Sequence, residues 1–129
     1  MLNTIILYSL LSTAFANVLF YGVNECGYEF GPIPGTYGVD YELPTNSSVD
    51  YFLGKGMNTI RFPFMWERVQ KNLNAELDPV ELSRMDTFIS YVTSKGAMLV
   101  LDPHNSARYN GQIIGGKIFQ TEKILTAIS

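Results

Sequence analysis

The sequence is short of several residue types on which common functions depend. It has one cysteine, Cys26, so no disulfide can form within the chain. It has one histidine, His104, and because metal sites need several such ligands we expect no metal. The net charge is −3 with no basic run, which removes the electrostatic basis for binding nucleic acid or an anionic membrane. No glycine-rich phosphate loop follows a predicted strand, so no nucleotide or other cofactor is expected.

The composition nevertheless supports a folded domain. The 129 residues are 47% hydrophobic and 13% aromatic, which is enough apolar material for a packed core and excludes a generally disordered chain. Neutral or hydroxylated ligands fit its charge better than anionic polymers do. We expect Cys26 to be buried and reduced, and the alternative is that it pairs with a cysteine outside this sequence.

The amino terminus has the pattern of a secretory signal peptide. A mostly apolar stretch runs over positions 5–11 and Ala14-Phe15-Ala16 has the pattern of a cleavage site, so we expect residues 1–16 to be removed and the protein to be secreted. The alternative is a first buried helix. A membrane anchor is disfavoured because the run is shorter than the ~20 residues that span a bilayer. Asn46-Ser47-Ser48 is a glycosylation sequon, and we expect Asn46 to lie in a polar loop.

From residue 17 onward, strands and helices alternate. Strands are predicted at 18–23, 58–63 and 97–101, and Pro103 is expected to end the third by removing a backbone donor. Helices are predicted at 48–55 and 79–95. Successive strand ends lie about forty residues apart, which leaves room for crossover helices and predicts a parallel βαβαβ sheet. Beyond Gly111 the chain is expected to be irregular, with the start of a third helix at 120–129.

The second predicted helix has clear start and packing signals. Asp78 is the expected N-cap, Pro79 suits the first helical position, and Glu81 is placed to complete a capping box. A stripe of apolar residues at three-and-four spacing predicts core packing against the sheet. The stripe consists of Leu82, Met85, Phe88, Ile89 and Val92.

Polar side chains collect where the predicted strands end. Asp102 and His104 follow the third strand, and Arg61 lies in the second. Because the carboxyl ends of parallel strands meet at one edge, these groups are expected to converge on a barrel mouth or crevice. The other members of this set are Asn24, Glu25, Glu29 and Asn105. The loops also carry aromatic residues whose flat rings suit a sugar ligand, namely Tyr28, Phe30, Tyr37, Tyr41 and Tyr109.

Three segments resemble a known family. They are YGVNECGYEFG (21–31), IRFPFMWER (60–68) and LDPHNSARYNG (101–111), which resemble the first three strand ends of a fungal endo-β-1,4-glucanase of glycoside hydrolase family 5. The resemblance runs from about residue 18 to residue 120. It implies an α/β fold in which residues 17–129 form the first three βα units of a (β/α)₈ TIM barrel, incomplete as written.

The resemblance also implies an activity. Such cellulases hydrolyse β-1,4-glucan with retention, using one glutamate as general acid/base and a second as nucleophile, ~5 Å apart. In the family these residues follow strands four and seven, the first of them within Asn-Glu-Pro. That motif does not occur in this sequence, so neither glutamate is assigned and the chain alone is expected to be inactive.

Two site residues follow from the family motifs. Arg61 matches an arginine that lies beneath the nucleophile, and His104 matches a histidine that hydrogen-bonds the sugar next to the cleaved bond. The alternatives are an ordinary ion pair for Arg61 and a backbone hydrogen bond for His104. Weaker candidates for ligand contacts are Asn105, Tyr109, Asn24 and Glu29. Glu67 and Arg68 are expected to form a structural pair.

A second hypothesis is a different class of protein. A secreted, non-catalytic glucan-binding or interaction protein could hold β-1,4-glucan through Arg61, His104 and the tyrosines. In both hypotheses the expected partner is β-glucan, without nucleic acid or membrane, and a complete protein would be a monomer. Three parallel strands cannot close an eight-stranded barrel, so an apolar face and a strand edge would stay open.

Overall fold

The computed structural model describes residues 18–115. The predicted signal peptide and the predicted helix at 120–129 lie outside the described residues. No helix within the described part is long and apolar enough to cross a membrane. The elements in chain order are β1 (Gly22–Asn24), α1 (Asn46–Gly54), β2 (Thr59–Phe64), α2 (Trp66–Val69), α3 (Pro79–Ser94), β3 (Met98–Pro103), β4 (Arg108–Tyr109) and β5 (Gln112–Ile113).

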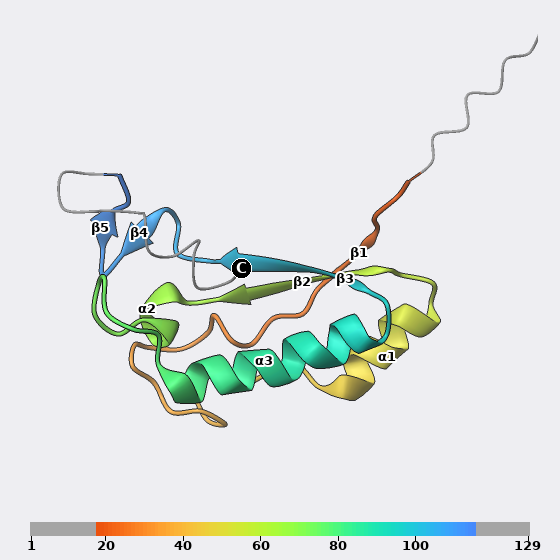
Figure 1. The fold of residues 1–129 in the computed structure, drawn as a ribbon, viewed down its shortest axis with the longest axis horizontal. Coiled ribbons are helices and arrows are strands. Elements are labelled where there is room, and N and C mark those ends of the chain that lie inside the picture. Colours follow the sequence, from red (N-terminus) through yellow and green to blue (C-terminus); the bar gives the residue numbers. More distant parts are fainter. Residues whose placement is uncertain (1–17, 116–129) are drawn as a thin grey trace, which may run out of the picture.

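A three-stranded parallel sheet organises the fold, in the order β1-β2-β3. Helices α1 and α3 connect successive strands and lie together against one face of the sheet (Figure 1). The register places Asn24 beside Arg61 and Arg61 beside Val100. The predicted βαβαβ topology is therefore confirmed.

The core lies between the sheet and α3. Alternate residues of a strand point to opposite faces, and Ile60, Phe62 and Phe64 of β2 are buried on the helix side. Phe88 of α3 meets Phe62 with ring centroids 4.7 Å apart. Met85 and Val92 are buried beside it, as the apolar stripe predicted, while Leu82 and Ile89 are partly buried.

The opposite face of the sheet is not covered by these helices. Met98 and Val100 of β3 are exposed there, and the side chains of Arg61 and Asp102 emerge on the same side. An alternating pattern on a parallel strand is unusual because such strands are ordinarily covered on both faces. The open apolar face expected from the sequence is thus present in the described residues.

The strand ends differ from their predicted positions. β1 begins at Gly22 instead of residue 18, and Tyr21 before it is held by two hydrogen bonds of 3.0 Å with Asn58. β3 continues to Pro103, which pairs with Phe64, so proline does not end the strand before that residue. Proline fits here because the missing donor costs nothing on a strand edge. The ladder then continues into the His104 N–H, which donates to the Phe64 carbonyl at 2.8 Å.

Two short elements are absent from the sequence prediction. One is α2, a single turn directly after β2. The other is the hairpin of β4 and β5, so the expectation of irregular chain beyond Gly111 is wrong. Its turn is Asn110-Gly111, with φ of 46° and 76°, a dipeptide typical of a two-residue hairpin because both positions need positive φ.

Capping explains where the longer helices start. The Asp78 carboxylate accepts from the N–H groups of Val80 and Glu81 at 3.0 Å, as predicted. The predicted capping box is wrong, because the Asp78 N–H donates to the Val69 carbonyl and Glu81 turns to other partners. Asn46 is the first residue of α1, exposed and preceded by the N-cap Thr45, so the predicted loop is also wrong there.

Candidate functional site

Arg61, Asp102 and His104 form a connected cluster on the uncovered face of the sheet. The Arg61 guanidinium donates to Asp102 Oδ2, and the same oxygen lies 2.9 Å from His104 Nδ1. Arg61 Nη2 is 3.1 Å from that nitrogen. The side chains of Arg61, Asp102 and His104 are 33%, 27% and 54% exposed, so a ligand can reach all three.

The roles within this cluster follow from donor chemistry. A guanidinium can only donate and a carboxylate can only accept, so we assign the Nδ1–H tautomer to His104, which then donates to Asp102. In this tautomer the 3.1 Å approach of Arg61 Nη2 to Nδ1 is a contact and not a hydrogen bond. Nε2 is then the ring nitrogen that can bond a ligand. Asp102 was in the predicted polar set but not among the predicted site residues. Its position two residues before His104, at the end of a strand, is the signal that both share one face.

Asn24 and Glu29 lie near this cluster at the end of β1. Asn24 is exposed and pairs in register with Arg61, and the following Glu25 N–H donates to the Arg61 carbonyl at 2.9 Å. Glu29 is partly buried and accepts from the Gly27 N–H at 2.8 Å. The structure therefore brings Asn24 to the cluster directly, while Glu29 shapes the loop after β1.

Cys26 also belongs to this neighbourhood, and its predicted burial is wrong. Its side chain is exposed because the loop after β1 turns it away from the core. Partial desolvation and a hydrogen bond with Glu29 raise the pKa of the Cys26 thiol, against the opposing charge of Arg61. A raised pKa keeps the thiol protonated, so Cys26 is a poor nucleophile here.

Asn105 and Tyr109 lie inside the molecule and not on the open face. Asn105 accepts from the Trp66 N–H at 2.7 Å and donates to Glu67. The Tyr109 hydroxyl donates to the Gln70 carbonyl at 2.6 Å, and its ring meets that of Trp66 at 4.9 Å. Both side chains are buried and engaged by other parts of the protein, which contradicts their predicted position in a ligand cleft.

Most of the predicted sugar-stacking aromatics are buried as well. Tyr28 and Tyr41 donate to the Glu81 carboxylate at 2.5 and 2.7 Å, deep in the core. Burial and Glu81 raise the pKa of Tyr41 to about 12, and the pKa of Tyr28 is raised for the same reasons. Only Phe30 and Tyr37 of this set are exposed, so the stacking prediction is wrong for Tyr28, Tyr41 and Tyr109.

Glu67 and Arg68 are both structural, but they do not form the predicted pair. Arg68 donates to the carbonyls of Tyr28 and Phe30 and lies 3.5 Å from the centroid of the Tyr41 ring. Glu67 accepts from Asn105 and from the Asn110 N–H. Successive residues of α2 thus anchor two different loops.

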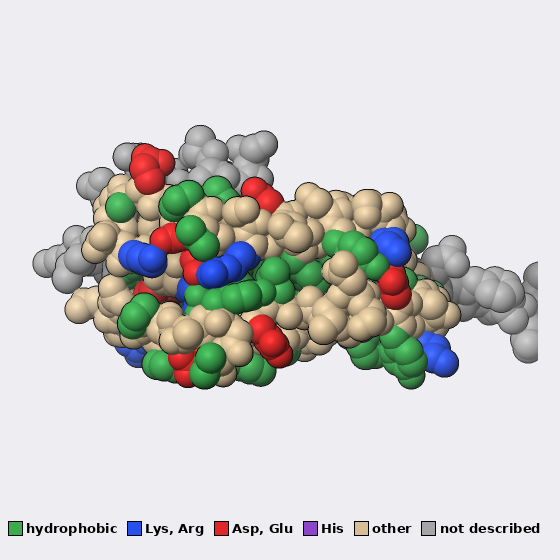
Figure 2. Space-filling model, turned by 90° about the horizontal axis from the view of Figure 1, so that it is seen from below, with side chains coloured by type: hydrophobic (Ala, Val, Ile, Leu, Met, Phe, Trp, Pro, Cys, Tyr) green, Lys and Arg blue, Asp and Glu red, His purple; other side chains and the backbone are tan. Residues whose placement is uncertain are grey.

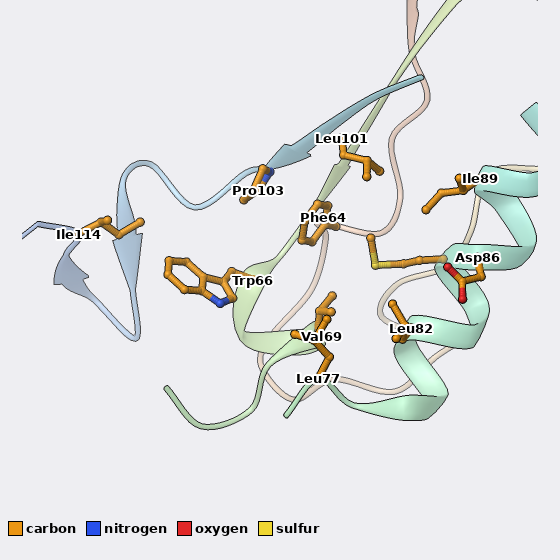
Figure 3. Close-up of a pocket in the computed structure, with 11 residues that line it drawn as sticks. Phe64, Trp66, Val69, Leu77, Leu82, Asp86, Ile89, Leu101, Pro103 and Ile114 are labelled. Carbon is orange, nitrogen blue, oxygen red and sulfur yellow. The ribbon is translucent and has the colours of Figure 1, made fainter. Parts of the chain in front are cut away.

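An apolar hollow lies on the helix side of the sheet, away from the cluster. It has a volume of ≈ 390 Å³ and is walled by Phe64 and Leu101 of the sheet, Leu82 and Ile89 of α3, and Ile114 (Figure 3). Figure 2 shows this helix side, where both charge signs are mixed and no histidine is seen. An almost entirely apolar lining offers no set of convergent polar groups for specific chemistry. Within residues 18–115, no group of three or more metal-ligating side chains occurs either.

Comparison with known proteins identifies the family. The sequence profile described as "Cellulase (glycosyl hydrolase family 5)" matches residues 17–129. This chain belongs to glycosyl hydrolase family 5. The Endo-beta-1,4-glucanase B of Aspergillus niger is 43% identical over 105 residues, which are 79% of this chain and 32% of that protein. The Endo-beta-1,4-glucanase B of Emericella nidulans is 38% identical, with 82% and 33% covered.

Solved structures of family 5 members share the fold. XacCel5A, solved in complex with cellopentaose, is 44% identical with a TM-score of 0.74, covering 78% of this chain and 33% of that one. The endo-beta-1,4-glucanase Xac0029 from Xanthomonas axonopodis pv. citri is 36% identical with a TM-score of 0.74, covering 79% and 33%. The chain therefore spans about a third of the length of its family 5 relatives. The predicted family and the partial α/β barrel are confirmed.

Proposed function

We propose that this chain is part of a secreted endo-β-1,4-glucanase that hydrolyses β-1,4-glucosidic bonds with retention by two glutamates. The observation that carries the proposal is the Arg61–Asp102–His104 cluster at the carboxyl edge of a family 5 sheet. Active sites of parallel barrels lie at this edge because the loops there converge from every strand. The cellopentaose complex of XacCel5A supports a β-glucan ligand.

Each residue of the cluster has a defined part in this proposal. The Arg61 guanidinium keeps a neighbouring nucleophilic glutamate ionised, because a nearby positive charge favours the carboxylate. Asp102 orients both Arg61 and the Nδ1–H side of His104. His104 then presents Nε2 to a sugar hydroxyl next to the cleaved bond. Asn24 adds an exposed amide beside Arg61.

A second candidate function is glucan binding without hydrolysis by this chain. The observation that favours it is that the three cluster side chains are already connected and exposed in residues 18–115. Neither an acid/base nor a nucleophilic glutamate is assigned among the residues that match the family motifs. We therefore propose that the 129-residue chain binds β-1,4-glucan without cleaving it.

Binding and cleavage can be measured on the same protein. Cellopentaose is titrated into the full 129-residue chain by calorimetry, and reducing sugar release is followed with a soluble cellulose derivative. We expect binding that weakens in His104→Ala and stays unchanged in Tyr51→Ala, a control that removes an exposed aromatic from α1. Cleavage that disappears in Glu29→Gln would overturn the non-catalytic role of this chain, and unaltered binding in His104→Ala would overturn the site.

Secretion is a further part of the proposal. It rests on the signal-peptide pattern of residues 1–16 and on the exposure of Asn46 at the start of α1, where a glycan can be attached. Amino-terminal sequencing of the protein secreted by a eukaryotic host should begin at Asn17. A product that retains Met1 in the cell would contradict it.

A further inference from the structure

The loop after β3 has a backbone conformation that its own sequence does not favour. Ser106 and Ala107 have φ values of 49° and 55°, in the left-handed region. That region is unfavourable for Ala and Ser because their Cβ crowds the following carbonyl. Contacts from elsewhere must therefore hold this loop, and His104 is the residue directly before it.

Glu67 of α2 holds both ends of the loop. Its carboxylate accepts from the Asn105 side-chain amide at the start and from the Asn110 N–H, at 2.6 Å, at the end. The neighbouring Trp66 N–H donates to Oδ1 of the Asn105 side chain at 2.7 Å. We name Trp66, Glu67, Asn105 and Asn110 the α2 clamp. It leaves both polar atoms of the Asn105 side chain bonded to α2.

The clamp is made of buried polar groups. Glu67 and Asn105 are only 7% and 8% exposed. A buried carboxylate is a costly means of stabilisation, since well-packed apolar residues often serve as well. The advantage of a carboxylate here is that its two oxygens form directional hydrogen bonds with two donors of the loop, the Asn105 amide and the Asn110 N–H.

We propose that Glu67 and Asn105 are positioning residues for His104. The ring of His104 stays on Asp102 because its residue is held on one side by the β2–β3 ladder and on the other by the α2 clamp. Neither residue needs to touch a ligand to act in this way. The importance of His104 itself rests on the function proposed above, whereas the clamp can be tested without glucan.

Three variants of the full chain test the clamp. In Glu67→Gln the new side-chain amide brings a further N–H donor. Whichever way the two amides turn, two donors then face each other at Asn105, at the Trp66 N–H or at the Asn110 N–H. In Asn105→Asp two carboxylates face each other. In the double variant E67Q/N105D every bond can form again: the glutamine donates to the aspartate and accepts from Asn110, and the aspartate accepts from Trp66. Glu81→Gln is the matched control, because Glu81 is a similarly buried carboxylate that binds Tyr28 and Tyr41 instead.

The ring of His104 gives a direct signal, since the chain has no other histidine. With isotope-labelled histidine, its ring resonances should form one sharp set in the parent protein. We expect split or broadened ring signals in both single variants. In Glu67→Gln, which changes the acceptor itself, we also expect exchange of the Asn110 amide to become about tenfold faster. The double variant should return to one set, and Glu81→Gln should keep one set even if it lowers stability.

Specific results would overturn the clamp. One is an unchanged single set of ring signals in Glu67→Gln and Asn105→Asp. Another is a double variant that is folded by circular dichroism but still shows split signals, a result that remains decisive if both single variants unfold. Cellopentaose titration of the parent is a separate measurement. Absence of binding there would reject the proposed glucan site, and the α2 clamp would still be tested by the His104 ring signals.

Discussion

Replacing Asp102 by asparagine should separate ligand binding from folding in the Arg61–Asp102–His104 cluster. Asparagine has nearly the same shape but no charge, so Arg61 loses its ion pair. In the parent, Arg61 and His104 both bond the same oxygen, Asp102 Oδ2, and a neutral amide oxygen accepts such bonds more weakly than a carboxylate does. The His104 ring is then held less firmly on its Nδ1–H side.

The expected magnitudes differ for the two properties. The Arg61 and Asp102 side chains are 33% and 27% exposed, and solvent-screened pairs of this kind contribute at most ~1 kcal/mol to stability. Losing one charge-assisted hydrogen bond to the ligand-binding groups costs about 1.5 kcal/mol in binding, or roughly tenfold in Kd. Asp102→Asn should therefore weaken cellopentaose binding more than it lowers stability.

Urea unfolding and calorimetric titration measure the two effects on one preparation. Asp50→Asn is the matched control, since it breaks a comparable exposed pair of 2.9 Å with Lys95 on the helix side of the molecule. It should leave cellopentaose binding unchanged. Tight binding retained in Asp102→Asn, or a stability loss above ~3 kcal/mol typical of a broken buried pair, would refute the assignment.

Two further predictions concern the core. Burial and Glu81 raise the pKa of Tyr41 from its ordinary value of 10 to about 12, so the folded state favours the neutral phenol. The stability that Tyr41 contributes in this way is complete below pH 10 and is lost as the pH rises towards 12. Tyr41→Phe should lose less stability than the parent between pH 9 and pH 11 in urea titrations, and equal losses would contradict the argument. Phe88→Ala removes a ring whose centroid lies 4.7 Å from that of Phe62, and it should lower the free energy of unfolding by ~3–5 kcal/mol. A folded variant that loses less than ~1 kcal/mol would show that α3 does not form this core contact.

Elements with strong local signals were predictable from the sequence. The three-and-four spacing from Leu82 to Val92 and the Asp78-Pro79 start located α3, whose cap forms as expected. Pro103 is the last residue of β3, as its missing donor predicted, although the strand itself runs two residues beyond the predicted end at residue 101. The β4–β5 hairpin had a usable signal in Asn110-Gly111, but strands of two residues carry no periodicity.

The predicted site residues likewise include some that were placed correctly and some that were not. Arg61 and His104 were placed together because a parallel sheet brings its carboxyl ends to one edge, a consequence of topology alone. Asn105, Tyr109 and Cys26 were misplaced, since their exposure depends on which way a loop turns and on what packs against it. Adjacent polar residues such as His104 and Asn105 look alike in a sequence, yet one is exposed and the other is buried against α2.

By itself the sequence determined the order of the three parallel strands and the two longer helices, the parallel sheet and the family, because hydrophobic periodicity, capping residues and family motifs are local along the chain. Only the tertiary structure decided which polar groups meet: that Asp102 joins Arg61 to His104, and that Glu67 bonds both ends of a loop about forty residues away. Hydrogen bonds of this kind form only when distant segments place donor and acceptor about 3 Å apart to within a few tenths of an ångström, which no local pattern encodes.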